Sequence, residues 1–136
     1  MFSRFRGILL AALLFVCSCT STDENQQKIR SVLEIRIRAL NTRDSTNYLS
    51  VISPHYNDKG KQFAQLKDSL EKNLSESEQL SYVAEKATIT INGSTAEAVS
   101  NYRLKIRVRG KELNFSGKEH LTLALEPNGW KIIAGI

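Results

Sequence analysis

Few side chains in this sequence could carry out chemistry, and Glu119 is the most distinctive of them. It falls on the same alternate-residue parity as the apolar positions of residues 113–125, so a regular strand would turn its carboxylate onto an apolar face. A carboxylate there is costly unless it is paired, which would indicate a tuned acid or a ligand contact. A β-bulge at Ser116-Gly117 would instead turn Glu119 outward, and this is the interpretation that we favour.

The remaining candidates are aromatic residues and one histidine. His55 follows Pro54 in a turn-rich segment, where a solvated histidine is the usual case, and aromatic residues at core parity more often pack than bind. The pocket candidates are Tyr48, His55, Tyr56, Tyr102, Glu119 and Trp130. None is assigned as catalytic.

Several kinds of site find no support in the sequence. His55 and His120 are the only histidines and lie far apart, so no metal site is predicted. Neither a glycine-rich phosphate loop nor a Gly-x-Ser-x-Gly motif is present, and we expect no cofactor.

A row of cations occupies alternate positions in the second half of the predicted strand 96–108 and the residue after its end: Arg103, Lys105, Arg107 and Arg109. Such a row could hold anionic headgroups, glycan-associated carboxylates or an acidic partner. It could equally be a solvated face, or an edge protected against pairing with other chains. We favour the solvated face, because we expect three carboxylates to lie across from the row: Glu97, Glu112 and Glu119.

The first 18 residues read as an export signal. Arg4 and Arg6 precede an apolar run at residues 8–16, which is too short to span a bilayer. Ser18 precedes Cys19 as in the lipobox that bacterial lipoproteins carry, and this resemblance implies that Cys19 is lipidated. Cys17 is an uncommon residue two positions before such a site, so the alternative is a plain secretory signal that leaves Cys19 as a free thiol.

The mature chain is predicted to hold one domain behind a short tether. Residues 19–27 are polar and read as a flexible tether, and residues 28–136 form the domain, which has no disulfide because no cysteine follows Cys19. Thr20 follows the lipidated position, which by resemblance to lipoproteins of two-membraned bacteria implies the periplasmic side of the outer membrane. Without Arg4 and Arg6 of the signal, the net positive charge of the mature chain is ordinary, and no nucleic-acid partner is expected.

The hydrophobic pattern changes from helical to alternating near residue 80. Helices are predicted at residues 29–40, from a cap at Asp44 or Ser45 to about 53, and at 63–74. Strands are predicted at 83–91, 96–108, 113–125 and 130–134, with a hairpin signal at Asn92-Gly93. The sequence therefore predicts an α+β fold in which three helices pack on one antiparallel sheet.

This order of elements resembles the NTF2-like superfamily, which includes SnoaL-like and DUF4440-type proteins. Three stretches carry the resemblance: residues 39–44 (ALNTRD), residues 52–56 (ISPHY) and residues 129–133 (GWKII). It implies a cone in which a strongly bent sheet wraps helices around a pocket, and homodimers that pack sheet to sheet. It does not imply one chemistry, because members include isomerases, dehydratases, transport factors and binding modules.

We expect a lipid-anchored envelope protein that binds a small molecule or an envelope partner without catalysis. The alternatives are a SnoaL/isomerase-like enzyme with Glu119 or His55 as its base, and a structural protein with a filled cone. The orientation of Glu119 distinguishes binding from catalysis. A buried Glu119 hydrogen-bonded to His55 or a tyrosine, beside an open cavity, would overturn the expectation of binding without catalysis and promote the enzyme. A solvent-facing Glu119 paired with Arg103 or Lys105 favours binding.

Overall fold

A computed structural model describes residues 19–136, so the predicted signal segment lies outside the described residues. Three helices precede the main sheet, with a small two-stranded sheet between the second and third. The elements are α1 (Cys19–Thr42), α2 (Ser45–Ser50), β1 (Asn57–Asp58), β2 (Lys61–Gln62), α3 (Phe63–Glu76), β3 (Gln79–Ala84), β4 (Thr88–Asn92), β5 (Thr95–Val108), β6 (Lys111–Glu126) and β7 (Gly129–Ala134). The predicted α+β class is confirmed.

The long strand β5 organises the main sheet, which is antiparallel throughout. One edge of β5 pairs with β6 along its whole length, and the other edge pairs first with β4 and then with β3. The tight turn between β5 and β6 is formed by Arg109 and Gly110, which both have positive φ, as a type I′ hairpin requires. The sheet then continues through β6 to β7.

The strand predicted at residues 83–91 is in fact two strands, β3 and β4. The chain leaves the ladder at residues 85–87, where the Glu85 N–H donates to the Asn101 carbonyl at 2.9 Å. The carbonyl of Ala87 accepts a hydrogen bond from the Arg30 guanidinium of α1 at 3.1 Å. The link is therefore held partly by a helix side chain, which a hydrophobic pattern does not reveal.

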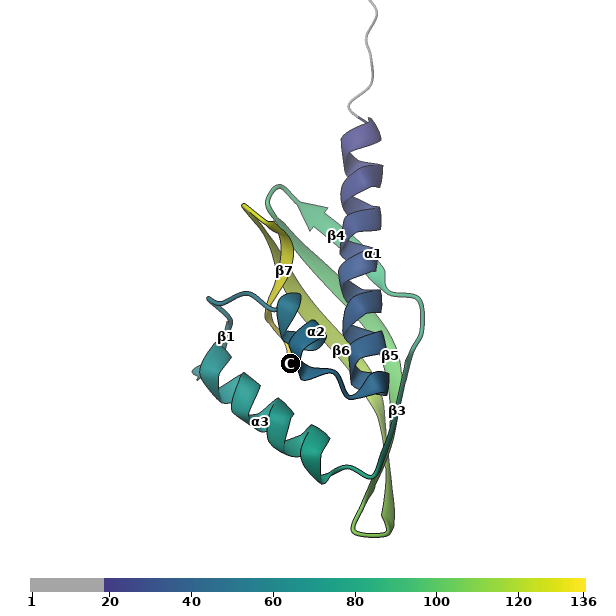
Figure 1. Ribbon diagram of the computed structural model, residues 1–136. Coiled ribbons are helices and arrows are strands. Elements are labelled where there is room, and N and C mark those ends of the chain that lie inside the picture. Colours follow the sequence, from purple (N-terminus) through teal and green to yellow (C-terminus); the bar gives the residue numbers. More distant parts are fainter. Residues whose placement is uncertain (1–18) are drawn as a thin grey trace, which may run out of the picture.

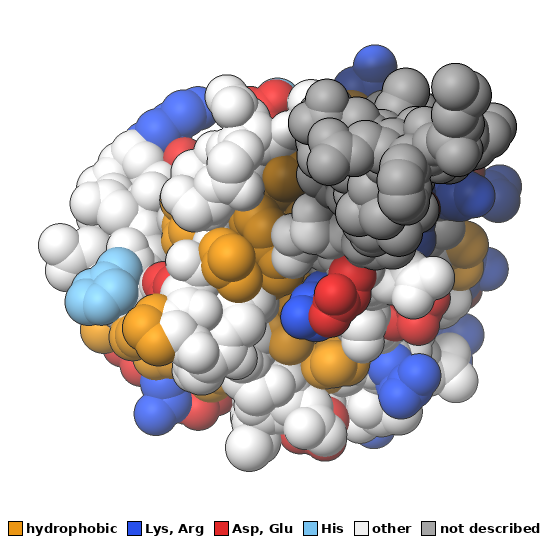
Figure 2. Space-filling model, turned by 90° about the horizontal axis from the view of Figure 1, so that it is seen from above, with side chains coloured by type: hydrophobic (Ala, Val, Ile, Leu, Met, Phe, Trp, Pro, Cys, Tyr) orange, Lys and Arg blue, Asp and Glu red, His pale blue; other side chains and the backbone are white. Residues whose placement is uncertain are grey.

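The sheet curls around the helices, and α1 crosses its inner face (Figure 1). The core lies between them and is built from aliphatic and aromatic residues of all three helices and the main sheet, among them Ile29, Ala39, Tyr48, Leu66, Leu70, Leu121, Leu123 and Ile132. Seen from above, apolar side chains gather towards the middle of the molecule, and charged side chains lie mostly around the margin (Figure 2). The far end of the β5–β6 hairpin extends past the helices (Figure 1), and there Leu113 and Phe115 stay 43% and 50% exposed.

The prediction of a flexible tether at residues 19–27 is wrong, because α1 begins at Cys19. Two polar side chains of this stretch have partners on the sheet. Asn25 Oδ1 accepts from the Trp130 indole N–H at 3.0 Å, and the Gln26 amide donates to the Ile89 carbonyl at 3.1 Å. In residues 19–136 no helix combines the length and apolar character needed to cross a membrane.

Candidate functional site

A buried ion pair lies at the centre of the cone. The Arg36 guanidinium donates to both carboxylate oxygens of Glu119, Nη1 to Oε1 at 2.9 Å and Nη2 to Oε2 at 2.7 Å. The Tyr82 hydroxyl donates to Glu119 Oε2 at 2.8 Å, and Arg36 Nε donates to the Tyr48 hydroxyl oxygen at 3.2 Å. Only 5% of the Arg36 side chain and 12% of the Glu119 side chain are exposed. We call these four residues the polar cluster.

Glu119 faces inward, so the predicted bulge at Ser116-Gly117 is wrong. The β5–β6 register runs without interruption through Arg103↔Ser116 and Tyr102↔Gly117, and the register shift lies instead in the β6–β7 pairing, where Ile133 of β7 has no partner between Thr122 and Leu123. Continuous pairing preserves the alternation, which turns Glu119 onto the apolar face.

The helices and strands bring the cluster together from four distant points in the sequence. Arg36 lies seven residues after the fully buried Ile29, which is two helical turns, so it occupies the apolar stripe of α1 rather than its border. Tyr82 comes from β3, where it lies opposite Leu104 of β5, and Tyr48 comes from α2. Asp44 caps α2 by accepting from the Asn47 N–H at 3.0 Å, which confirms one of the two predicted caps.

Burial and charge set the protonation of the cluster. Burial opposes the charge of Arg36, but Tyr48, Glu119 and Tyr82 together outweigh it, so the pKa of Arg36 is raised. Burial raises the pKa of Tyr82, and Glu119 adds to this while the Arg36 guanidinium opposes it. The guanidinium carbon lies 5.6 Å from the Tyr48 ring centroid and 5.4 Å from that of Tyr82, within cation–π range. The cluster therefore contains a charged arginine and a neutral phenol at physiological pH.

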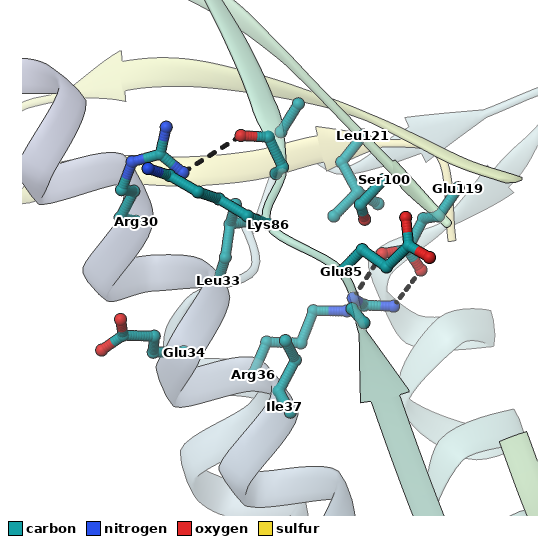
Figure 3. Close-up of a pocket in the computed structure, with 13 residues that line it drawn as sticks. Arg30, Leu33, Glu34, Arg36, Ile37, Glu85, Lys86, Ser100, Glu119 and Leu121 are labelled. Carbon is teal, nitrogen blue, oxygen red and sulfur yellow. Dashed lines mark hydrogen bonds and ion pairs between the residues drawn. The ribbon is translucent and has the colours of Figure 1, made fainter. Parts of the chain in front are cut away.

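Two cavities border the polar cluster, and Arg36 and Glu119 line both. The α3-side cavity, about 630 Å³, lies between α3 and the β5–β6 hairpin. Its walls are mostly apolar, with Leu66, Leu70, Leu80, Leu104, Ile106 and Phe115 among them. The α1-side cavity, about 360 Å³, lies between α1 and the β3–β4 link. Figure 3 shows Arg30 and Lys86 at one side of the α1-side cavity and the Arg36–Glu119 pair at the other.

The structure brings three of the six pocket candidates together. Tyr48 and Glu119 belong to the polar cluster, and the Tyr102 ring stacks on Tyr82 with centroids 5.6 Å apart. His55 is exposed in the loop after α2 and lines neither cavity.

Tyr56 and Trp130 serve the core instead. The Tyr56 hydroxyl donates to the Ile136 carbonyl and accepts from the Ile136 N–H, both at 2.9 Å. Trp130 is 3% exposed and lines neither cavity. These two residues fix the C-terminal strand and α1 rather than a binding site.

The basic row lies on the outer face of the sheet, opposite the polar cluster. Lys105 and Arg107 share Glu112 at 3.5 and 4.0 Å. Of the other two predicted counter-charges, Glu97 pairs with His120 at 3.3 Å and Glu119 faces inward. Only one of the three carboxylates therefore neutralises the row.

Sequence reasoning missed Arg36 as a site residue and did not consider Tyr82. The spacing of Arg36 from Ile29 and Leu40 puts it on the apolar stripe of α1. A charged residue at such a position predicts a buried partner, and the inward parity of Glu119 supplies one. Across the described part of the chain, no cluster of histidine, cysteine or acidic residues could hold a metal ion.

Comparisons with known proteins identify the fold. No family model matches the sequence, and no curated protein matches it significantly. Among solved structures, an NTF2-like superfamily protein from Salmonella enterica serovar Typhimurium matches with a TM-score of 0.75 at 17% identity, over 83% of this chain and 89% of that one. A protein proposed as a dehydratase of the NTF2-like family, from Streptomyces avermitilis, matches with a TM-score of 0.68 at 11% identity, over 82% and 93%.

A protein proposed as an aromatic ring hydroxylase, from Novosphingobium aromaticivorans, is similar to the same degree. It matches with a TM-score of 0.74 at 15% identity, over 82% of this chain and 86% of that one. The chain has the NTF2-like fold, as its sequence predicts. The fold hosts several activities among these structures and excludes neither binding nor catalysis.

Proposed function

We propose that this chain is an exported lipoprotein, anchored through Cys19, whose α3-side cavity binds a small and mainly apolar molecule without converting it. In a two-membraned cell the anchor would lie on the periplasmic side of the outer membrane. The lipobox-like residues before Cys19 support the anchor. One observation carries the binding proposal: the walls of the α3-side cavity are mostly apolar, whereas the polar cluster, which we call its floor, offers hydrogen-bond donors without a net charge.

The donors on the floor define the ligand. The Tyr48 hydroxyl accepts from Arg36, and its own proton has no acceptor among the described residues. Arg36 uses three of its five N–H bonds within the cluster. Because Glu119 cancels the charge of Arg36, the floor suits a neutral acceptor, such as a carbonyl or hydroxyl oxygen, better than an anion. The aliphatic walls suit the apolar remainder of such a molecule.

The hydrogen bonds from Arg36 to Glu119 argue against Glu119 as a catalytic base. Three of the roughly four lone-pair sites of the carboxylate already accept hydrogen bonds. A proton taken up by Glu119 would leave a buried guanidinium without its counter-charge, which is strongly unfavourable. The cluster is therefore better built to hold a ligand than to remove a proton from it.

A tryptophan placed in the cavity tests the proposal. Leu104→Trp should fill part of the α3-side cavity, and Thr90→Trp, on the exposed face of β4, is the matched control. The probe is a medium-chain methyl ketone, and its affinity for the detergent-extracted full chain is measured by nuclear magnetic resonance titration. We expect Leu104→Trp to weaken binding at least about tenfold and Thr90→Trp to leave it unchanged. Equal binding by both variants, or none by the wild type, would refute the proposal.

One observation favours a second candidate, an enzyme that transfers a proton. Glu119 is buried, hydrogen-bonded to Tyr82 and adjacent to open cavities, which meets the condition under which the sequence favours the enzyme over binding. That condition did not include the bidentate contact with Arg36, and this contact is the reason why binding is still proposed first. The same methyl ketone distinguishes the two functions, since a general base would exchange its α-protons for deuterium in D₂O. Exchange that is accelerated by the wild type and lost in Glu119→Gln would establish the enzyme. An unaccelerated rate with the ketone bound supports binding alone.

A further inference from the structure

The outer face of the sheet carries a groove that the small-molecule site does not use. Three adjoining hollows of about 380, 370 and 530 Å³ run over β3, β5 and the facing part of β6. The first two share Ser81 and Lys105, and the second and third share Val83, Arg103 and Ser116. We call these three hollows together the cationic groove.

Strand pairing explains why the groove is both hollow and basic. Two cations of β5 stand between smaller residues of the neighbouring strands: Arg103 between Val83 and Ser116, and Lys105 between Ser81 and Asn114. The short neighbours leave space on each side of a long basic side chain. Hydroxyl and amide groups along the groove add hydrogen-bond donors, and Val83 stays 53% exposed beside them. The face therefore offers charge, donors and room together.

The positive charge of the groove is only partly compensated. Glu112 serves both Lys105 and Arg107, whereas Arg103 and Lys118 form no ion pair with any residue between 19 and 136. Lys118 lies opposite Asn101 on the same face, one step along the ladder from Arg103. Arg109 and Lys111, at and beside the hairpin turn, extend the positive field. The centre of the groove thus holds two cations without an ion-pair partner among the described residues, and Glu85, which accepts a hydrogen bond from Asn101, is the one carboxylate that lines the same hollow.

This charge argues against a second copy of the chain as the occupant, and therefore against a sheet-to-sheet homodimer through this part of the sheet, which the family resemblance implies and which stays a prediction. Two copies packed face to face through this surface would oppose one set of arginine and lysine residues with another, and like charges brought together disfavour association. The groove also lies on the half of β5 that pairs with β3, beside the end of α1 farthest from Cys19 (Figure 1). A membrane that held Cys19 would therefore lie at the opposite end of the molecule.

We propose that the cationic groove binds an extended acidic segment of another protein. Cations at every second residue of β5 are spaced by roughly 6.6 Å, which is also the spacing of alternate side chains along an extended peptide. Carboxylates at alternate positions of such a segment would meet Arg103, Lys105 and Arg107 in turn. Ser81, Ser116 and Asn114 would donate to its backbone carbonyls and side chains. The interaction would weaken with rising salt, because the groove is exposed.

Poly-L-glutamate, which is charged and extended at neutral pH, serves as the probe. Its binding to the detergent-extracted full chain is measured by fluorescence anisotropy, for the wild type and for the double variant Arg103→Ser/Lys118→Ser. The matched control is Lys67→Ser/Lys72→Ser, which removes the same charge from the exposed face of α3. We expect at least about a tenfold loss in the groove variant and less than about a twofold loss in the control.

Three results would overturn the proposal. Equal losses in the two double variants would show that only net charge matters. Tighter binding to polyphosphate of matched charge would assign the groove to a phosphate polymer instead. Absence of binding by the wild type at low salt would leave the groove without an acidic partner. The methyl ketone titration does not depend on these variants, so the two proposals can fail separately.

Discussion

Removing the charge of Glu119 should destabilise the fold strongly, because it would leave the buried Arg36 guanidinium without a counter-charge. Glu119→Gln keeps the size of the side chain but removes the counter-charge of a guanidinium whose side chain is 5% exposed. Breaking a buried ion pair from one side costs about 3–5 kcal/mol. The Glu119 side chain is 12% exposed and borders two cavities, so water can relieve part of the loss. We therefore expect a loss of about 3 kcal/mol, the lower end of that range.

The free energy of unfolding is measured by urea titration. Trp130 is the only tryptophan in the sequence and is 3% exposed, so its fluorescence reports on unfolding of the core. The matched control is Glu97→Gln, which breaks an exposed pair with His120 and should change stability by less than about 1 kcal/mol.

The double variant Arg36→Met/Glu119→Gln completes a thermodynamic cycle. It leaves no buried charge unpaired, so it should be more stable than Glu119→Gln alone, by roughly 1–2 kcal/mol. The reasoning would be refuted if Glu119→Gln lost less than about 1 kcal/mol, or if the double variant were less stable than both single variants.

Three further predictions concern pH, the first helix and the anchor. Burial raises the pKa of Tyr82 and of Tyr56, so at high pH the folded state keeps protons that the unfolded chain releases. The free energy of unfolding, measured by urea titration, should therefore fall above about pH 10. The variant Tyr82→Phe should make that fall shallower. Deleting residues 19–27 removes the hydrogen bonds of Asn25 and Gln26 to the sheet. The remaining domain should still melt cooperatively in calorimetry, with a free energy of unfolding lower by about 1–3 kcal/mol. An unchanged melt would contradict a stabilising role for these two hydrogen bonds. Cys19→Ser should move the chain from the membrane to the soluble fraction, and retention equal to that of the wild type would exclude the lipid anchor.

The sequence predicts the fold well where local patterns determine it. Alternation over residues 96–108 identifies β5, and the helical stripe from Ile29 to Leu40 places α1. The Asn92-Gly93 signal locates the β4–β5 hairpin, in which Asn92 pairs with Thr95 and the turn residues are Gly93 and Ser94. The failures occur where a distant partner decides the local structure. Residues 19–27 lack an apolar period, and the structure gives Asn25 and Gln26 partners on the sheet.

The polar cluster could be predicted only in part. Parity alone turns Glu119 inward, but the cost of a buried carboxylate favours a bulge unless a cation is known to lie opposite it. That cation, Arg36, lies 83 residues away in the sequence, and only the tertiary fold brings the two together. In the sequence the buried ion pair therefore shows only as an arginine on an apolar helix stripe and a glutamate on an apolar strand face. Each of these two features can be explained locally, without a partner.

The most direct test of the account is to find where the methyl ketone binds. Intermolecular nuclear Overhauser effects between the ketone and the labelled full chain would locate its alkyl chain and its methyl group. The account predicts contacts from the alkyl chain to Leu70 and Leu104, with the carbonyl end near Tyr48. Contacts confined to Leu33 and Ala87 of the α1-side cavity, or to the outer face of the sheet, would contradict it.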